Sequence, residues 1–125
     1  MPRAIRITAG GVSATAELND SRAAAAIAAR LPITATAETW GDEIYFGLPF
    51  TAPSDAPQET VALGDLGYWP PGKAFCIFFG PTPASRGDEV RPASPVNVVG
   101  RIDGDPKAFK QVGAGTKVRL ERDAE

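Results

Sequence analysis

Residues 64–83 read GDLGYWPPGKAFCIFFGPTP and hold five aromatics, four prolines and four glycines in twenty positions. We interpret Pro70-Pro71-Gly72 as a turn that joins two strands, residues 66–69 and 73–80. Proline presets the φ angle that a turn needs, and glycine accepts the unusual φ that follows. Pro81 and Pro83 then stop the pairing, because proline cannot donate to a strand ladder.

The second of these strands is apolar on both of its faces. Strand alternation points Phe75, Ile77 and Phe79 one way and Ala74, Cys76 and Phe78 the other way. A strand that is hydrophobic on both faces is typical of a sheet centre that is covered on both sides. We therefore expect the fold to be organised around this strand.

The flanking sequence predicts further short strands and two helices within one domain, residues 1–125. Gly10-Gly11 lies between two alternating runs, which favours a hairpin. Small polar residues before an alanine-rich stretch and Pro32 after it predict a helix near 20–31, and Asp105-Pro106 predicts another at 105–112. Other strands are expected in 33–46, broken at Gly41-Asp42, from 61–63, in 96–102 and near the end at 118–120. Long loops are expected at 47–59 and 82–95. About eight short strands with two helices indicate a mainly β fold, a closed eight-stranded antiparallel barrel.

The composition excludes several function classes. The chain has no histidine, so Ser-His-Asp and Cys-His nucleophile systems and histidine metal sites are ruled out. Cys76 is the single cysteine, which excludes an internal disulfide and a cysteine zinc cage. With 13 Lys and Arg against 15 Asp and Glu and no basic run, we expect no nucleic-acid or membrane partner. We expect no metal or other cofactor, and a cytoplasmic location because the start of the chain does not read as a signal peptide.

Three long motifs resemble the small prokaryotic cyclophilin-like family, which was first described as a domain of unknown function. They are LNDSRAAAAIAARLP (18–32), TWGDEIYFGLP (39–49) and the 64–83 stretch, with weaker support from VNVVGRI (96–102) and KVRLE (117–121). The resemblance spans nearly the whole chain and implies an eight-stranded cyclophilin-like barrel capped by helices. It implies no particular activity.

The sequence departs from true cyclophilins, which are peptidyl-prolyl isomerases, at the positions that carry their catalysis. No arginine occurs between Arg30 and Arg86, whereas cyclophilins have their catalytic arginine in that region. An overlay of GKAFCI on the similar cyclophilin strand puts Ala74 at a pocket glutamine and Cys76 at a pocket phenylalanine. Val96 similarly stands at the position of a histidine. The resemblance therefore favours an apolar pocket without the known catalytic donor.

Seven residues beside turn signals are candidates for ligand binding. Large amphipathic aromatics give rigid contact area with a polar tip, although they also serve as core or barrel-end plugs. Carboxylates beside glycines can orient a ligand, although they also cap turns. The candidate aromatics are Trp40, Tyr45, Tyr68 and Trp69, and the candidate carboxylates are Asp42, Glu43 and Asp65.

The leading functional hypothesis is a domain that binds a small molecule or a proline-containing extended peptide, without efficient isomerase catalysis. One alternative is a peptidyl-prolyl isomerase that uses a relocated arginine, such as Arg86 or Arg91. Another is a partner in an amide-processing assembly, since cyclophilin-like domains also occur in such assemblies. The sequence does not determine the oligomeric state.

Overall fold

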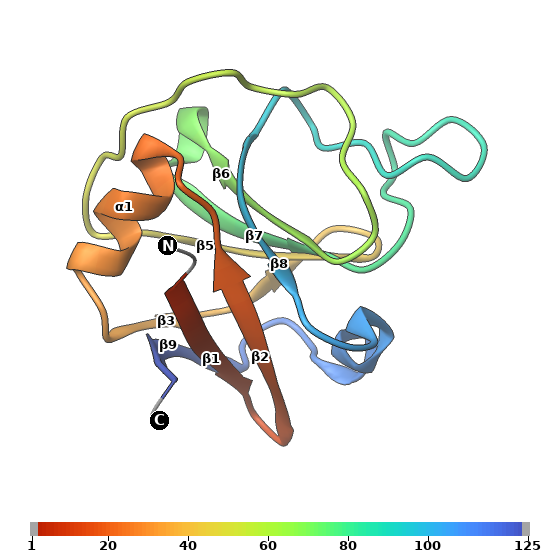
Figure 1. The fold of residues 1–125 in the computed structure, drawn as a ribbon. Coiled ribbons are helices and arrows are strands. Elements are labelled where there is room, and N and C mark those ends of the chain that lie inside the picture. Colours follow the sequence, from red (N-terminus) through yellow and green to blue (C-terminus); the bar gives the residue numbers. More distant parts are fainter. Residues whose placement is uncertain (1–2, 124–125) are drawn as a thin grey trace.

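A computed structural model describes residues 3–123, which form nine strands, one α-helix and two 3-10 helices. Figure 1 shows the strands wrapped into a barrel. The strands are β1 (Arg3–Ala9), β2 (Val12–Leu18), β3 (Ile33–Thr36), β4 (Glu38–Thr39), β5 (Glu43–Gly47), β6 (Asp65–Trp69), β7 (Ala74–Phe78), β8 (Asn97–Ile102) and β9 (Lys117–Arg122). The helices are α1 (Arg22–Ala29), η1 (Pro70–Gly72) and η2 (Pro106–Gln111).

All strands belong to one antiparallel sheet in the order β3-β9-β1-β2-β8-β6-β7-β5-β4. The two edges, β3 and β4, follow each other directly in the chain, so the sheet curls into a nearly closed barrel. The predicted antiparallel barrel is confirmed. The described residues hold nine strands where eight were expected, because residues 33–47 divide into three strands, of which β4 has only two residues.

The two predicted N-terminal elements are confirmed. Gly10 has φ +60° at the tip of the β1–β2 hairpin, a conformation that favours glycine. The hairpin register pairs Ala9 with Val12 and Arg3 with Leu18. In α1, the Ser21 side chain caps the helix by accepting a hydrogen bond from the Ala24 N–H at 3.2 Å. The small buried residues of α1, Ala23, Ala24 and Ala28, let the helix approach the barrel closely.

The central position predicted for the strand after Pro-Pro-Gly is also confirmed. Strand β7 pairs with β5 on one side and with β6 on the other, and all five of its residues are buried. Phe75 and Ile77 belong to the main core inside the barrel, whereas Cys76 and Phe78 belong to a second, smaller cluster on the outer face. The expected coverage of both faces is therefore found.

Two long irregular segments, 48–64 and 79–96, connect these strands. Leu48, Phe50 and Ala52 of the first pack in the main core, whereas Val90 and Val96 of the second belong to the smaller outer cluster. Two isolated bridges tie them together, Gln58 with Val96 and Val61 with Val90. The strand predicted from 61–63 is reduced to the bridge at Val61, and regular pairing begins at β6. The second predicted helix forms as the 3-10 helix η2, whose Phe109 is buried against Phe79 with ring centroids 6.4 Å apart.

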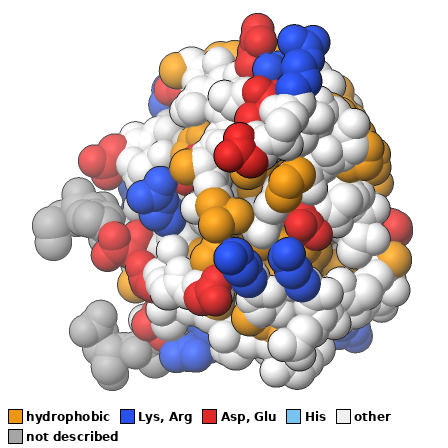
Figure 2. All heavy atoms as spheres, turned by 90° about the vertical axis from the view of Figure 1, so that its right-hand side faces the viewer, with side chains coloured by type: hydrophobic (Ala, Val, Ile, Leu, Met, Phe, Trp, Pro, Cys, Tyr) orange, Lys and Arg blue, Asp and Glu red, His pale blue; other side chains and the backbone are white. Residues whose placement is uncertain are grey.

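The surface and the helices add two further facts. On the face shown in Figure 2, acidic and basic side chains are interspersed, with hydrophobic side chains between them. That face therefore carries no large patch of one charge. Within residues 3–123, no helix combines the length and the apolar character needed to span a bilayer.

Candidate functional site

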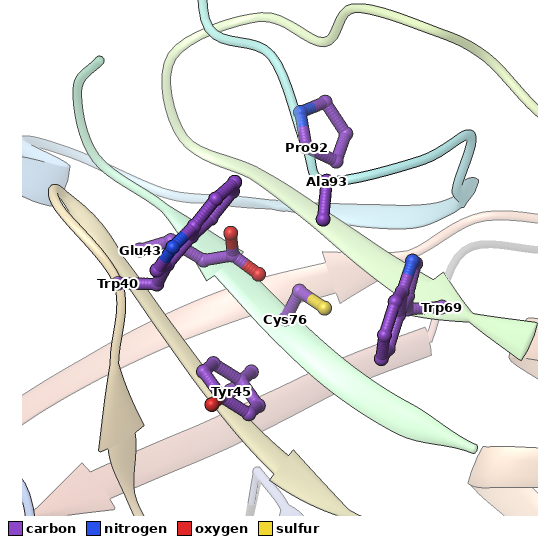
Figure 3. A pocket seen from close by; sticks show the side chains of 7 residues that line it. All are labelled: Trp40, Glu43, Tyr45, Trp69, Cys76, Pro92 and Ala93. Atoms are coloured by element: carbon purple, nitrogen blue, oxygen red, sulfur yellow. The ribbon is translucent and has the colours of Figure 1, made fainter. Parts of the chain in front are cut away.

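A cavity of about 260 Å³ lies on the outer face of the sheet, above β5 and β7 and beneath segment 79–96. Figure 3 shows its lining: Trp40 and Trp69 stand at opposite sides, and Glu43 and Cys76 lie between them on the sheet. Most of the lining is aromatic or apolar, and a single carboxyl group enters it. The lining residues are Trp40, Glu43, Tyr45, Trp69, Cys76, Pro92 and Ala93.

Sheet geometry explains why side chains from three strands meet there. Glu43 and Tyr45 are two residues apart in β5, so alternation turns both to the same face. The pairing of β5 with β7 sets Tyr45 directly opposite Cys76. The pairing of β6 with β7 sets Trp69 opposite Ala74, and cross-strand partners share a face.

A clamped turn positions Trp40 and Glu43. The Trp40 N–H donates to the Glu43 carbonyl at 3.0 Å, and the Asp42 backbone exchanges hydrogen bonds with Pro81 (2.9 Å) and Phe79 (3.0 Å). Gly41 has φ +61°, and a Cβ at this position would lie 2.9 Å from the Thr82 Cα. The turn therefore requires glycine both for its conformation and for its close approach to residues 81–83.

Two contacts hold the Trp69 indole in place. Its Nε1–H donates a hydrogen bond of 2.7 Å to the Ser94 Oγ, which links β6 to the covering segment. Its ring also packs on Gly72, where a Cβ would lie only 2.7 Å from the Trp69 Cζ3. The indole is thus fixed before any ligand arrives, which lowers the entropy lost on binding.

Glu43 is the electrostatic centre of the cavity. The residue is only 5% exposed, and burial raises the pKa of its carboxyl from 4.5 to about 7. A hydrogen bond with the Cys76 thiol acts in the opposite direction, because it stabilises the carboxylate. Among residues 3–123, no lysine or arginine lines the cavity, so Glu43 enters it without a basic partner.

Cys76 forms the floor of the cavity as a protonated thiol. Burial raises the pKa of this thiol well above its ordinary value, and the neighbouring charge of Glu43 raises it further. Since the thiolate is the nucleophilic form of cysteine, Cys76 is chemically quiet at neutral pH. Its thiol serves as a weak donor and as apolar surface.

The structure brings together four of the seven predicted site residues and places the other three elsewhere. Tyr68 lies inside the barrel, where its hydroxyl accepts a 3.0 Å hydrogen bond from the Ala52 N–H. Asp42 faces Lys110, with 3.6 Å between Oδ2 and Nζ. Asp65 accepts a 2.8 Å hydrogen bond from the Ala62 N–H and pairs with Arg101 at 3.5 Å. These three residues therefore have structural roles outside the cavity, while Trp40, Glu43, Tyr45 and Trp69 line it.

Three lining residues are not among the seven candidates: Cys76, Pro92 and Ala93. The first stands opposite Tyr45, and the overlay on the cyclophilin strand had already placed it at a pocket position. The other two lie in an irregular segment, and no local sequence signal indicates where such a segment folds back. No group of three or more His, Cys, Asp or Glu side chains suited to a metal ion occurs between residues 3 and 123.

Comparisons with known proteins agree on the kind of domain. A family model described as Cyclophilin-like matches residues 3–121. The solution structure of a hypothetical protein from Archaeoglobus fulgidus is similar at 41% sequence identity and a TM-score of 0.81, over 98% of this chain and 95% of that one. No curated protein matches the sequence.

Proposed function

Because this chain belongs to the cyclophilin-like family, we propose that it is a binding domain rather than an efficient isomerase. Its cavity would take one small organic group, either a free molecule or a proline ring of an extended peptide. The observation that carries the proposal is the juxtaposition of two tryptophans, a tyrosine and one buried carboxyl group around a preformed cavity.

The character of the cavity supports small-group binding. Its volume of about 260 Å³ lies just below the range of roughly 300–1,000 Å³ that is common for drug-sized ligands. Aromatic walls supply most of the contact, and one polar group supplies orientation, which is the usual division in ligand sites. Trp69 is held by Gly72 and Ser94, so little ordering is needed on binding.

Isomerase catalysis would need a positioned donor at the reacting peptide bond. Arg91 is next to the lining residue Pro92, but its guanidinium is committed to two carboxylates: Nε lies 2.6 Å from Glu89, and Nη1 lies 3.6 Å from Glu59. The hydrogen bond with Glu89 raises the pKa of Arg91 further. Because the Arg91 guanidinium is already paired, it is not free to act as the catalytic donor. This pairing supports binding without turnover.

The test is a thermal-shift and calorimetric screen of small molecules and Xaa-Pro peptides. We expect hits that stabilise the wild-type protein, since a ligand of the folded state raises its stability by mass action. Trp69→Ala, checked for folding by circular dichroism, should lose these hits. Leu63→Ala is the matched control, because Leu63 is an exposed hydrophobic residue that does not line the cavity.

Two results would contradict the proposal. One is a Trp69→Ala variant that binds the hits as tightly as the wild type. The other is clear turnover of Xaa-Pro peptides in a protease-coupled assay, abolished by Arg91→Ala or Arg86→Ala, which would establish the isomerase alternative.

A further inference from the structure

The carboxyl group of Glu43 is buried without a positively charged neighbour. It is only 5% exposed and points into the cavity (Figure 3). The ion pairs found among residues 3–123 do not include Glu43. A buried charge without a partner is costly, so a cation entering the cavity would relieve the carboxylate at the same time as it was bound.

The aromatic rings around Glu43 suit the same kind of ligand. In Figure 3, the Trp40 and Trp69 indoles are seen edge-on, so each turns a ring face toward the space between them, with Tyr45 below. The face of an aromatic ring carries negative charge density and attracts cations, most strongly in tryptophan. An ordinary hydrated ammonium or a metal ion gains little from such walls, whereas an alkylated ammonium offers both charge and apolar surface.

We propose that the cavity binds an alkylammonium cation, with Trp40, Tyr45 and Trp69 as its cage and the Glu43 carboxylate as its counter-ion. This inference rests on the proposed binding function and specifies its ligand class. The cation would sit between the two indoles, above Cys76, whose thiol stays protonated and adds no competing charge.

The inference has a signature in the pH dependence of binding. The titratable groups that line the cavity with Glu43 are the Tyr45 hydroxyl in the same strand, β5, and the Cys76 thiol in β7. The tryptophans and the segment 79–96, through Pro92 and Ala93, add no titratable group. Glu43, with a pKa of about 7, is the group that changes charge near neutrality. A cation favours the ionised form, so binding releases a proton, and affinity rises with pH up to that value and then levels off. By this linkage, affinity at pH 8 should exceed that at pH 6 by about tenfold.

The experiment compares choline with its neutral isostere, 3,3-dimethylbutan-1-ol, by isothermal titration calorimetry on the full chain. Tetramethylammonium serves as a second cationic probe. We expect choline to bind the wild type at least about tenfold more tightly than the neutral alcohol at pH 8, and only the two cations to show the pH dependence.

Two variants separate charge from shape. Glu43→Gln should weaken choline binding at least about tenfold and flatten its pH dependence, while leaving the neutral alcohol unaffected. Trp69→Leu keeps an apolar wall but removes the indole face, so it should weaken choline more than the alcohol. Glu17→Gln, an exposed carboxyl in β2 that does not line the cavity, is the control and should change neither.

The outcomes distinguish this inference from the proposed function. If the neutral alcohol binds as tightly as choline, or if Glu43→Gln leaves choline binding unchanged, the cation assignment is wrong and the binding domain stands. If the wild type binds choline with no change between pH 6 and 8, the counter-ion role of Glu43 is wrong. If neither probe binds and the broader screen also yields no ligand, both proposals fail.

Discussion

The two faces of the central strands make an instructive contrast. On the inner face, Phe46, Phe75 and Tyr68 are at most 2% exposed, and the Phe46 and Phe75 rings stack with centroids 5.3 Å apart. On the outer face, the same three strands present Glu43, Tyr45, Cys76 and Trp69 around a cavity. The backbone is shared, so the difference lies only in which alternate residues are chosen and in what covers them.

The comparison teaches that burial serves two purposes in this barrel. On the inner face, hydrophobic side chains fill the space, and their burial stabilises the fold. The outer face is covered by irregular segments that leave a hollow, where burial instead sets the charge state of Glu43. Substitutions on the two faces should therefore differ in what they change.

Phe75→Ala should be the most damaging change, because it opens a cavity in the filled inner face. We expect a loss of about 3–5 kcal/mol in the free energy of unfolding, measured by chemical denaturation. Cys76→Ala, the adjacent residue on the outer face, removes one atom beside an existing hollow and should lose about 1 kcal/mol or less. Equal losses for the two variants would mean that the faces are not energetically different.

Glu43 should make the stability of the protein depend on pH. Its carboxyl keeps its proton up to about pH 7 in the folded state, against 4.5 as the ordinary value, so the folded state binds more protons in between. The stabilising contribution is therefore complete below pH 4.5 and is lost as the pH rises through 7. At about 1.4 kcal/mol per pH unit, the loss is about 3 kcal/mol.

The measurement compares the unfolding free energies of the wild type and Glu43→Gln from pH 4.5 to 8. The difference between them should shift by about 3 kcal/mol in favour of the variant as the pH rises. For the control Glu17→Gln, the difference from the wild type should stay constant. A constant difference for Glu43→Gln as well would show that its carboxyl titrates normally.

The two tyrosines provide a smaller, matched test. Tyr68→Phe removes the acceptor of the buried Ala52 N–H and should reduce stability by about 1–3 kcal/mol. Tyr45→Phe, on the half-exposed outer face, should change stability by less than about 0.5 kcal/mol. Chemical denaturation of the two variants measures both losses. A larger loss for Tyr45→Phe than for Tyr68→Phe would refute the assignment of Tyr68 to the core.

Gly72→Ala should have a small effect on stability and a clear effect on the cavity. The backbone there does not need a positive φ, but the added Cβ would collide with the Trp69 ring. We expect a stability loss of about 1 kcal/mol, with a shift in tryptophan fluorescence and weaker binding of the screened ligands. Unchanged fluorescence and binding would show that Trp69 does not depend on Gly72 for its position.

Alternation and turn chemistry carried most of the fold prediction. The β1–β2 hairpin, the α1 helix and the central strand β7 follow from patterns that extend over several residues. Residues 61–63 misled the prediction, because a short apolar run can pair at one point only, as Val61 does with Val90. The helix predicted at 105–112 was placed to within one residue at each end of η2, but the sequence signals did not specify 3-10 rather than α geometry.

The candidate site was harder to predict because it depends on register and on loop paths. Tyr68 and Trp69 are adjacent in one strand, so they had to lie on opposite faces, and grouping them ignored that alternation. Pairing Tyr45 with Cys76 requires a register that local patterns do not specify. Pro92 and Ala93 reach the cavity through contacts between segments that are distant in sequence, which turn residues alone cannot predict.

The covering segment 79–96 supplies one wall of the cavity from outside the strands of the barrel. Pro92, Ala93 and Ser94 complete the cavity, yet they lie outside the nine strands. Insertions and substitutions in such a segment leave strand pairing intact, because they touch none of its ladder hydrogen bonds. A change confined to residues 92–94 would therefore reshape one wall of the cavity without altering the strand pairing that positions Glu43, Tyr45 and Trp69.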